Sequence, residues 1–189
     1  MGYFNSIAGN WNYEDFFFQE FIPTIEKNYR IRTNKQYRAV AGLSMGGGGS
    51  FMYALHHPEL FSSACPLSAY VGPLTIEEAK SRVKKSNPEI TDEAQIKAYF
   101  ENHNAIALVN KMTEDQKKEV RWYIDCGDDD FLYEGNSLIH IAMRKKILLM
   151  NSELVMGSIT GHTGVQPYPK FWSLSQLSFM KIKTLRIIG

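Results

Sequence analysis

Residues 42–46 read Gly42-Leu43-Ser44-Met45-Gly46 and stand between an apolar run and a run of further glycines. The apolar run at 37–43 predicts a short buried strand. Residues 47–57 predict a helix that is closed by Pro58. A serine on a tight strand-to-helix turn, with a glycine two residues to each side, is the arrangement that exposes a nucleophilic hydroxyl.

An ordinary glycine-rich turn and a phosphate-binding loop are the alternatives for this segment. A phosphate loop would need a lysine followed by Ser or Thr, whereas Gly49 is followed by Ser50-Phe51. We therefore reject the phosphate loop, and the strand–serine–helix context favours a nucleophile over a structural turn. Each extra glycine weakens a helix by up to about 1 kcal/mol relative to Ala. The glycines are expected where the helix start packs very close to neighbouring strands, and the Met45 amide then faces an oxyanion.

A helix is predicted at residues 13–29, ahead of this segment. Asn12 is expected to cap its start, and Pro23 to bend it. Its apolar side chains recur at helical spacing and are Phe17, Phe18, Phe21, Ile22 and Ile25.

Further strands are predicted at 64–71, 120–126 and 152–159, and another amphipathic helix at 135–149. Helices and strands alternate, which predicts an α/β fold with a mostly parallel sheet and helices on both of its faces. Residues 74–119 are polar and helical in pattern, and we interpret them as a helical insertion on one side of the sheet.

The composition predicts a single domain over residues 1–189, because 44% of the residues are hydrophobic. The 21 basic and 20 acidic residues nearly cancel, so no nucleic-acid partner and no membrane partner is expected. The chain shows no signal peptide, which leaves the localisation open between cytoplasmic and secreted. We expect Cys65 and Cys126, which lie in apolar stretches, to be buried core thiols.

Chemically active side chains follow two later strands. Gly127-Asp128-Asp129-Asp130 comes after the strand at 120–126, and Gly161-His162 comes after the strand at 152–159. The carboxyl ends of parallel strands meet at one edge of a sheet, where such sheets place their sites. The order Ser44, acid, His162 is that of a catalytic triad in which the acid orients the histidine that shuttles the proton.

The acidic triplet also has alternatives, namely a solvated turn or a calcium loop. The calcium pattern fails, because the required Gly and terminal Glu are missing when the count starts at Asp125 or at Asp128. Structural roles are expected for the four remaining histidines, which are His56, His57, His103 and His140.

Three motifs together resemble one family. They are Tyr13-Glu14-Asp15-Phe16-Phe17, Gly42-Leu43-Ser44-Met45-Gly46-Gly47 and Asp125-Cys126-Gly127-Asp128-Asp129-Asp130-Phe131-Leu132. They resemble the putative-esterase family, which includes the feruloyl and acetylxylan esterases of carbohydrate esterase family 1, S-formylglutathione hydrolase and the mycolyltransferases. The resemblance runs from about residue 13 to residue 163.

The resemblance implies a serine esterase with an α/β-hydrolase fold and no metal or cofactor. It implies Ser44 as nucleophile, His162 as base and Asp130 as the acid, with Asp129 as the second choice. The Met45 amide would bind the oxyanion. The implied substrate is an acyl ester of a sugar, such as feruloylated or acetylated xylan, and a small thioester is the alternative.

The chain departs from the family at its front. The family has strands ahead of the helix at 13–29, and their loops supply the second oxyanion donor; this chain has none. The fold is therefore expected to be a partial α/β-hydrolase fold in which the strand at 37–43 becomes an edge. An exposed apolar edge tends to pair with another chain, so we expect a homo-oligomer. A catalytically impaired relative is the alternative function.

The tail at 164–189 also departs from the family, which usually continues into an amphipathic helix. Pro167 and Pro169 interrupt any helical pattern here. A one-base shift of the reading frame after Thr163 can encode an amphipathic helix beginning with Trp. A frameshift is therefore our hypothesis for the tail, and the codons of the gene would test it.

Overall fold

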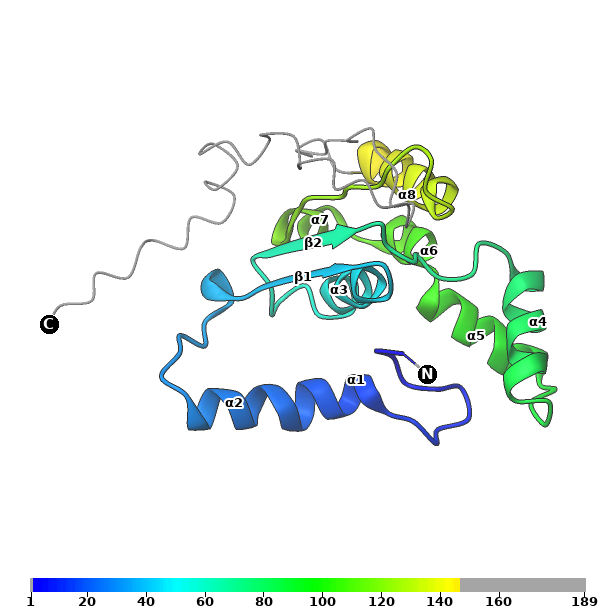
Figure 1. Ribbon diagram of the computed structural model, residues 1–189, viewed down its shortest axis with the longest axis horizontal. Helices are drawn as coiled ribbons and strands as arrows, with labels where there is room; N and C mark the ends of the chain where they lie inside the picture. Colours follow the sequence, from blue (N-terminus) through cyan, green and yellow to red (C-terminus); the bar gives the residue numbers. More distant parts are fainter. Residues whose placement is uncertain (1, 147–189) are drawn as a thin grey trace, which may run out of the picture. The chain divides into compact units, whose positions relative to one another are not determined.

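The computed structural model describes residues 2–146 (Figure 1). The predicted strand at 152–159, His162 and the tail at 164–189 lie outside the described residues. Among residues 2–146, no helix is both long and apolar enough to cross a membrane.

The described residues form a parallel three-stranded sheet in the order β1-β2-β3. Its strands are β1 (Ala39–Leu43), β2 (Ser63–Leu67) and β3 (Arg121–Trp122), and the register sets Val40 opposite Ala64 and Leu43 opposite Leu67. The prediction of a parallel α/β fold is therefore confirmed. Two strands are shorter than expected. Ser68 takes a positive φ of 38° and so leaves the extended conformation after β2, while β3 is continued only by a bridge between Leu67 and Asp125.

Helix α3 (Met45–His56) packs against β1 and β2 (Figure 1). Its residues from Gly47 to Leu55 are buried, and the Phe51 ring stacks on Trp122 with 5.0 Å between centroids. A Cβ atom added at Gly47 would lie 2.5 Å from the Leu67 carbonyl oxygen. One added at Gly48 would lie 2.5 Å from the Tyr70 carbonyl oxygen. The expected close packing of the glycine-rich helix start is thus confirmed.

The N-terminal helical run has three parts, α1 (Tyr13–Phe16), a π-helical turn η1 (Phe17–Phe21) and α2 (Ile22–Asn28). In the π-turn the Ile22 N–H donates to the Phe17 carbonyl, directly before Pro23. Proline lacks an N–H and crowds the preceding turn, which accounts for the wider turn at this point. The run packs on α3, because Phe17 stacks on the Tyr53 ring.

The expected cap at Asn12 is wrong. Asn12 stands at the N-cap position but its side chain makes no capping hydrogen bond. Instead, Asn5 Oδ1 accepts a hydrogen bond from the Asp15 N–H at 3.2 Å. The loop before α1 folds back onto the helix start, and Asn5 in this loop supplies the cap.

The insertion predicted at 74–119 is helical as expected. It consists of α4 (Ile76–Ser86), α5 (Glu93–His103), α6 (Ala105–Lys111) and α7 (Glu114–Glu119). Each begins at a side-chain cap, provided in turn by Thr75, Asp92, Asn104 and Thr113. The chain then enters β3, and its described part ends in α8 (Tyr133–Lys146). Earlier in the chain, a short 3-10 turn η2 (Lys35–Tyr37) precedes β1.

Both cysteines are free thiols, as expected. Cys126 is buried, whereas Cys65 is only half-buried. Side chains alternate along β2, and the neighbours of Cys65, Ala64 and Pro66, take the fully buried positions.

Candidate active site

Ser44 sits on a strained turn between β1 and α3. Its backbone angles are φ 55° and ψ −111°, in a region that non-glycine residues rarely adopt. Hydrogen bonds hold the turn on both sides, because the Ser44 N–H donates to the Leu67 carbonyl and the Gly48 N–H donates to the Ser44 carbonyl, both at 2.9 Å. Ser44 is exposed to solvent at this turn.

The two glycines that flank Ser44 have different physical roles. A Cβ atom on Gly42 would collide with backbone atoms of Gly46. A Cβ atom on Gly46 would meet only the Tyr3 hydroxyl, at 4.0 Å. The first glycine is required because the chain folds back onto it, and the second has room for a methyl group.

Met45 is the first residue of α3. Backbone N–H groups in the first turn of a helix have no partner within that helix, and the helix dipole makes this end positive. The Met45 N–H is one of these groups and directly follows Ser44 in the chain, and Met45 is 58% exposed.

The turn and the acidic loop lie at the same edge of the sheet. Ser44 bonds to Leu67 at the end of β2, and Leu67 is bridged in turn to Asp125. The next residue along, Ser68, donates its N–H to the Asp125 carbonyl at 2.7 Å. The structure therefore brings Asp125, from which the acidic loop continues, to the strand ends that carry Ser44. His162 lies outside the described residues.

Asp130 differs from its two neighbours in the triplet. Asp128 and Asp129 are exposed, whereas Asp130 is half-buried. One carboxylate oxygen of Asp130, Oδ1, accepts the Leu132 N–H at 2.8 Å, and its carbonyl accepts the Tyr133 N–H at 2.9 Å at the start of α8. These bonds fix the Asp130 carboxylate while those of Asp128 and Asp129 lie in solvent.

Asn136 in α8 was not among the predicted site residues. Its side chain is fully buried and bonds to the backbone of Ala69, in the loop that follows β2. Asn136, Ile139 and Met143 form the buried stripe of α8, at helical spacing. A polar amide at helical spacing from the apolar Ile139 and Met143 was the signal available in the sequence, although His140 is a second buried polar residue of α8.

Tyr70 connects the serine turn to the insertion. Its N–H points at the Ser44 carbonyl at 3.4 Å, and the Arg82 guanidinium lies 5.1 Å from the centre of its ring. Burial raises the pKa of the Tyr70 hydroxyl, and Arg82 only partly offsets this. Arg82 projects from α4 and pairs with Glu78 at 2.8 Å.

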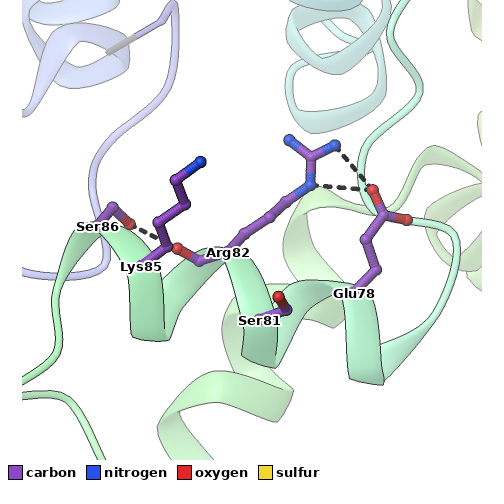
Figure 2. Close-up of a pocket in the computed structure, with 5 residues that line it drawn as sticks. All are labelled: Glu78, Ser81, Arg82, Lys85 and Ser86. Carbon is purple, nitrogen blue, oxygen red and sulfur yellow. Dashed lines mark hydrogen bonds and ion pairs between the residues drawn. The ribbon is translucent and has the colours of Figure 1, made fainter.

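Figure 2 shows Glu78, Arg82 and Lys85 projecting from the same side of α4. Together with Ser81 and Ser86 they line an open depression of about 780 Å³. One of these lining residues, Arg82, also lies over the ring of Tyr70, whose backbone N–H approaches the Ser44 carbonyl.

Three of the other histidines gather around Glu14, away from Ser44. His56 Nδ1 lies 2.6 Å from Glu14 Oε1, and His56 Nε2 lies 2.9 Å from the Asn102 carbonyl. His57 Nε2 lies 3.5 Å from the same carboxylate oxygen, and the His103 ring stands edge-on to His56. The cluster joins α1, α3 and α5, which agrees with the structural roles expected for these histidines.

The pKa values in this cluster follow from that pairing. Burial would raise the pKa of Glu14, but hydrogen bonds and charge from His56 and His57 outweigh it and lower the value to about 2. Burial would lower the pKa of His56, yet the bond to Glu14 raises it above its ordinary value. His103 lacks such a partner, and burial lowers its pKa.

The two thiols are poor candidates for a nucleophile. Burial, with smaller contributions from nearby carboxylates, raises the pKa of Cys65 and of Cys126 to about 11. Since the thiolate is the reactive form, neither thiol competes with Ser44 near neutral pH.

Solved structures with the same fold include a ferulic acid esterase, which is 36% identical and has a TM-score of 0.65. The match covers 82% of this chain and 56% of that one, so the chain spans about half of its length. An S-formylglutathione hydrolase from Staphylococcus aureus is 22% identical, with a TM-score of 0.57 over 77% of this chain and 56% of that one, and supports the fold alone.

Two curated relatives match over shorter stretches. An esterase of Mycobacterium tuberculosis is 39% identical over 72 residues, which are 38% of this chain and 15% of the relative. An endo-1,4-beta-xylanase/feruloyl esterase of Xylanibacter ruminicola is 45% identical over 49 residues, 26% of this chain and 7% of the relative. The family described as "Putative esterase" matches residues 3–175, and the chain therefore belongs to this esterase family.

Proposed function

We propose that this chain carries the nucleophile, acid and base of a serine carboxylic-ester hydrolase. The observation that supports this most strongly is the exposed Ser44, which is held at φ 55° on a strand-to-helix turn. A strained backbone at an exposed serine costs stability, and such strain is typical of residues placed for chemistry. Membership of the esterase family points to the same chemistry.

In the proposed reaction Ser44 Oγ attacks the carbonyl carbon of an ester while His162 accepts the hydroxyl proton. The carbonyl oxygen becomes an oxyanion that the Met45 N–H binds. The intermediate collapses, the C–O bond to the alcohol breaks, and His162 returns the proton to the leaving alcohol. Water then hydrolyses the acyl-enzyme by the same steps, with Asp130 orienting His162 throughout.

For the substrate we propose an acyl ester of a sugar, such as a feruloyl or acetyl ester. Both the ferulic acid esterase at 36% identity and the feruloyl esterase of X. ruminicola at 45% support this choice. The Tyr70 N–H approaches the Ser44 carbonyl and the Tyr70 ring lies against the Arg82 guanidinium, and we propose that an aromatic acyl group packs on this ring. A small thioester is the second substrate candidate.

A catalytically impaired relative is the second candidate function. One observation favours it: within residues 2–146, β1 pairs with β2 and has no strand on its other side. Loss of a single oxyanion donor reduces kcat by about 10² to 10³. The impaired relative would keep the fold and the serine turn but show little turnover.

Hydrolysis of p-nitrophenyl acetate and methyl ferulate by the wild type and Ser44→Ala decides between the two. We expect Ser44→Ala to lower kcat by about 10³-fold or more. Ser6→Ala, in the N-terminal loop, is the matched control and should retain the wild-type rate. Equal, near-background rates for wild type and Ser44→Ala would refute the esterase proposal for this chain.

A further inference from the structure

Asn136 is a buried amide that reaches two loops at once. Its side chain is 0% exposed and sits on the face of α8 that packs into the core. Its Oδ1 accepts the Ala69 N–H at 3.3 Å, and its Nδ2 donates to the Ala69 carbonyl at 2.9 Å and to the Leu132 carbonyl at 2.8 Å. One side chain therefore satisfies both backbone groups of Ala69 and one of Leu132.

The Ala69 side of this contact borders the Ser44 turn. Ser68, the residue before Ala69, has a positive φ of 38°, and Tyr70, the residue after it, approaches the Ser44 carbonyl through its N–H. The Tyr70 carbonyl also packs against Gly48 in the first turns of α3. A shift of Ala69 would therefore move the atoms that support Ser44 and the start of α3.

The Leu132 side borders Asp130. The Leu132 N–H donates to Asp130 Oδ1 at 2.8 Å, while the Leu132 carbonyl accepts from Asn136. The peptide groups on both sides of Leu132 thus join the Asn136 amide to the Asp130 carboxylate.

We propose that Asn136 is a positioning residue that fixes the Asp130 loop relative to the Ser44 turn. This inference rests on the proposed function, in which both residues act on one ester. The role requires an acceptor and two donors on one rigid group, and among side chains of this size only an amide supplies them. Aspartate has the same shape but no donor, and it would set a carboxylate against two carbonyl oxygens.

Asn136→Asp is the informative variant, and Asn104→Asp is its matched control. Asn104, in the insertion, is also buried, at 4% exposed; it accepts the Ala107 N–H and donates to the Pro73 carbonyl just before the insertion. Both variants keep the acceptor and lose the donors. We expect Asn136→Asp to lower kcat for methyl ferulate by about 10- to 100-fold with KM within about 2-fold. Asn104→Asp should leave kcat near the wild-type value at a comparable loss of thermal stability.

Hydrogen exchange followed by mass spectrometry supplies a readout that needs no turnover. We expect Asn136→Asp, and Asn136→Ala if the aspartate variant does not fold, to speed exchange in peptides covering 42–48, 66–72 and 128–133. Asn104→Asp should change exchange neither at 42–48 nor at 128–133. Unchanged exchange at 42–48, or a kcat loss no larger than that of Asn104→Asp, would overturn the positioning role. A wild type no faster than Ser44→Ala would refute the esterase proposal alone, and exchange at 42–48 and 128–133 would then decide whether Asn136 couples the two loops.

Discussion

The backbone of Gly46 occupies the space that a Cβ atom on Gly42 would need. This contact exists because the chain reverses at Ser44 and α3 starts directly against the end of β1. The glycine on the strand side is therefore a steric requirement of the turn, and the glycine on the helix side is not.

Gly42→Ala is expected to destabilise the protein by about 3 kcal/mol or to prevent folding, because the methyl group meets backbone that cannot move aside. Gly46→Ala should change the free energy of unfolding by no more than about 1 kcal/mol, and in the stabilising direction, because alanine favours a helix. Urea denaturation of both variants measures the difference. Equal losses in the free energy of unfolding for the two variants would contradict the close contact between Gly42 and the Gly46 backbone.

The Glu14–His56 pair predicts how stability depends on pH. The pKa of Glu14 is lowered to about 2, so its contribution is present above its ordinary value of 4.5 and is lost as pH falls towards 2. The pKa of His56 is raised above 6.5, so its contribution is complete below 6.5 and is lost as pH rises through the raised value. Their joint contribution should be largest between about pH 4.5 and 6.5.

His56→Gln tests this pH dependence, because it removes the positive charge of the histidine and leaves the Glu14 carboxylate. We expect the free energy of unfolding to fall by about 2 kcal/mol near pH 5.5, and this loss should shrink towards pH 9. The difference in melting temperature from the wild type, measured across pH, should follow the same trend. Glu59→Gln is the control, because Glu59 is an exposed partner of His57. A loss that is the same at all pH values would contradict the charged pairing.

In the part of the chain that the structure describes, β1 has a strand on one side only, and this predicts self-association. Ala39, Ala41 and Leu43 are exposed along this strand, and Leu43 is 50% exposed. Light scattering at rising protein concentration should show a homo-oligomer, and Ala39→Lys should shift it towards the monomer because a charge on an edge strand opposes pairing. A wild type that stays monomeric at high concentration would rule out this edge as an interface.

Asp130→Asn and Asp129→Asn test which acid acts. The amide oxygen of Asn can still accept the Leu132 N–H, so the loop should keep its shape at position 130. We expect Asp130→Asn to lower kcat by about 10² to 10⁴, because the amide cannot stabilise a charged histidine. Asp129 is exposed, and its variant should stay within about 2-fold of the wild type. The reverse order would assign the role to Asp129.

The parts of the fold that follow local rules were predictable from the sequence. The strand, serine turn and helix around Ser44 are encoded by neighbouring residues, and so are the helices of the insertion, each of which starts at its own cap. The sequence also predicts that Ser44 and the acidic loop lie at the same edge of the sheet. The alternation of helices and strands indicates parallel strands, and the carboxyl ends of parallel strands meet at one edge.

The remaining features depend on contacts between distant residues. Asn5 caps α1 from outside the helix, His56 pairs with Glu14 across 42 positions, and Asn136 reaches Ala69 across 67. No periodicity marks such pairs, because each depends on how whole elements pack. The π-turn before Pro23 likewise reflects a local conflict that helical spacing alone does not reveal.

Covalent labelling by a fluorophosphonate tests the central claim, that Ser44 is an activated nucleophile. The serine oxygen displaces fluoride from phosphorus, and peptide mapping by mass spectrometry locates the adduct. We predict one adduct, on Ser44, that is absent from Ser44→Ala and from heat-denatured protein and that forms more slowly in Asp130→Asn. Labelling of another residue, or none on Ser44 in the folded wild type, would contradict the claim.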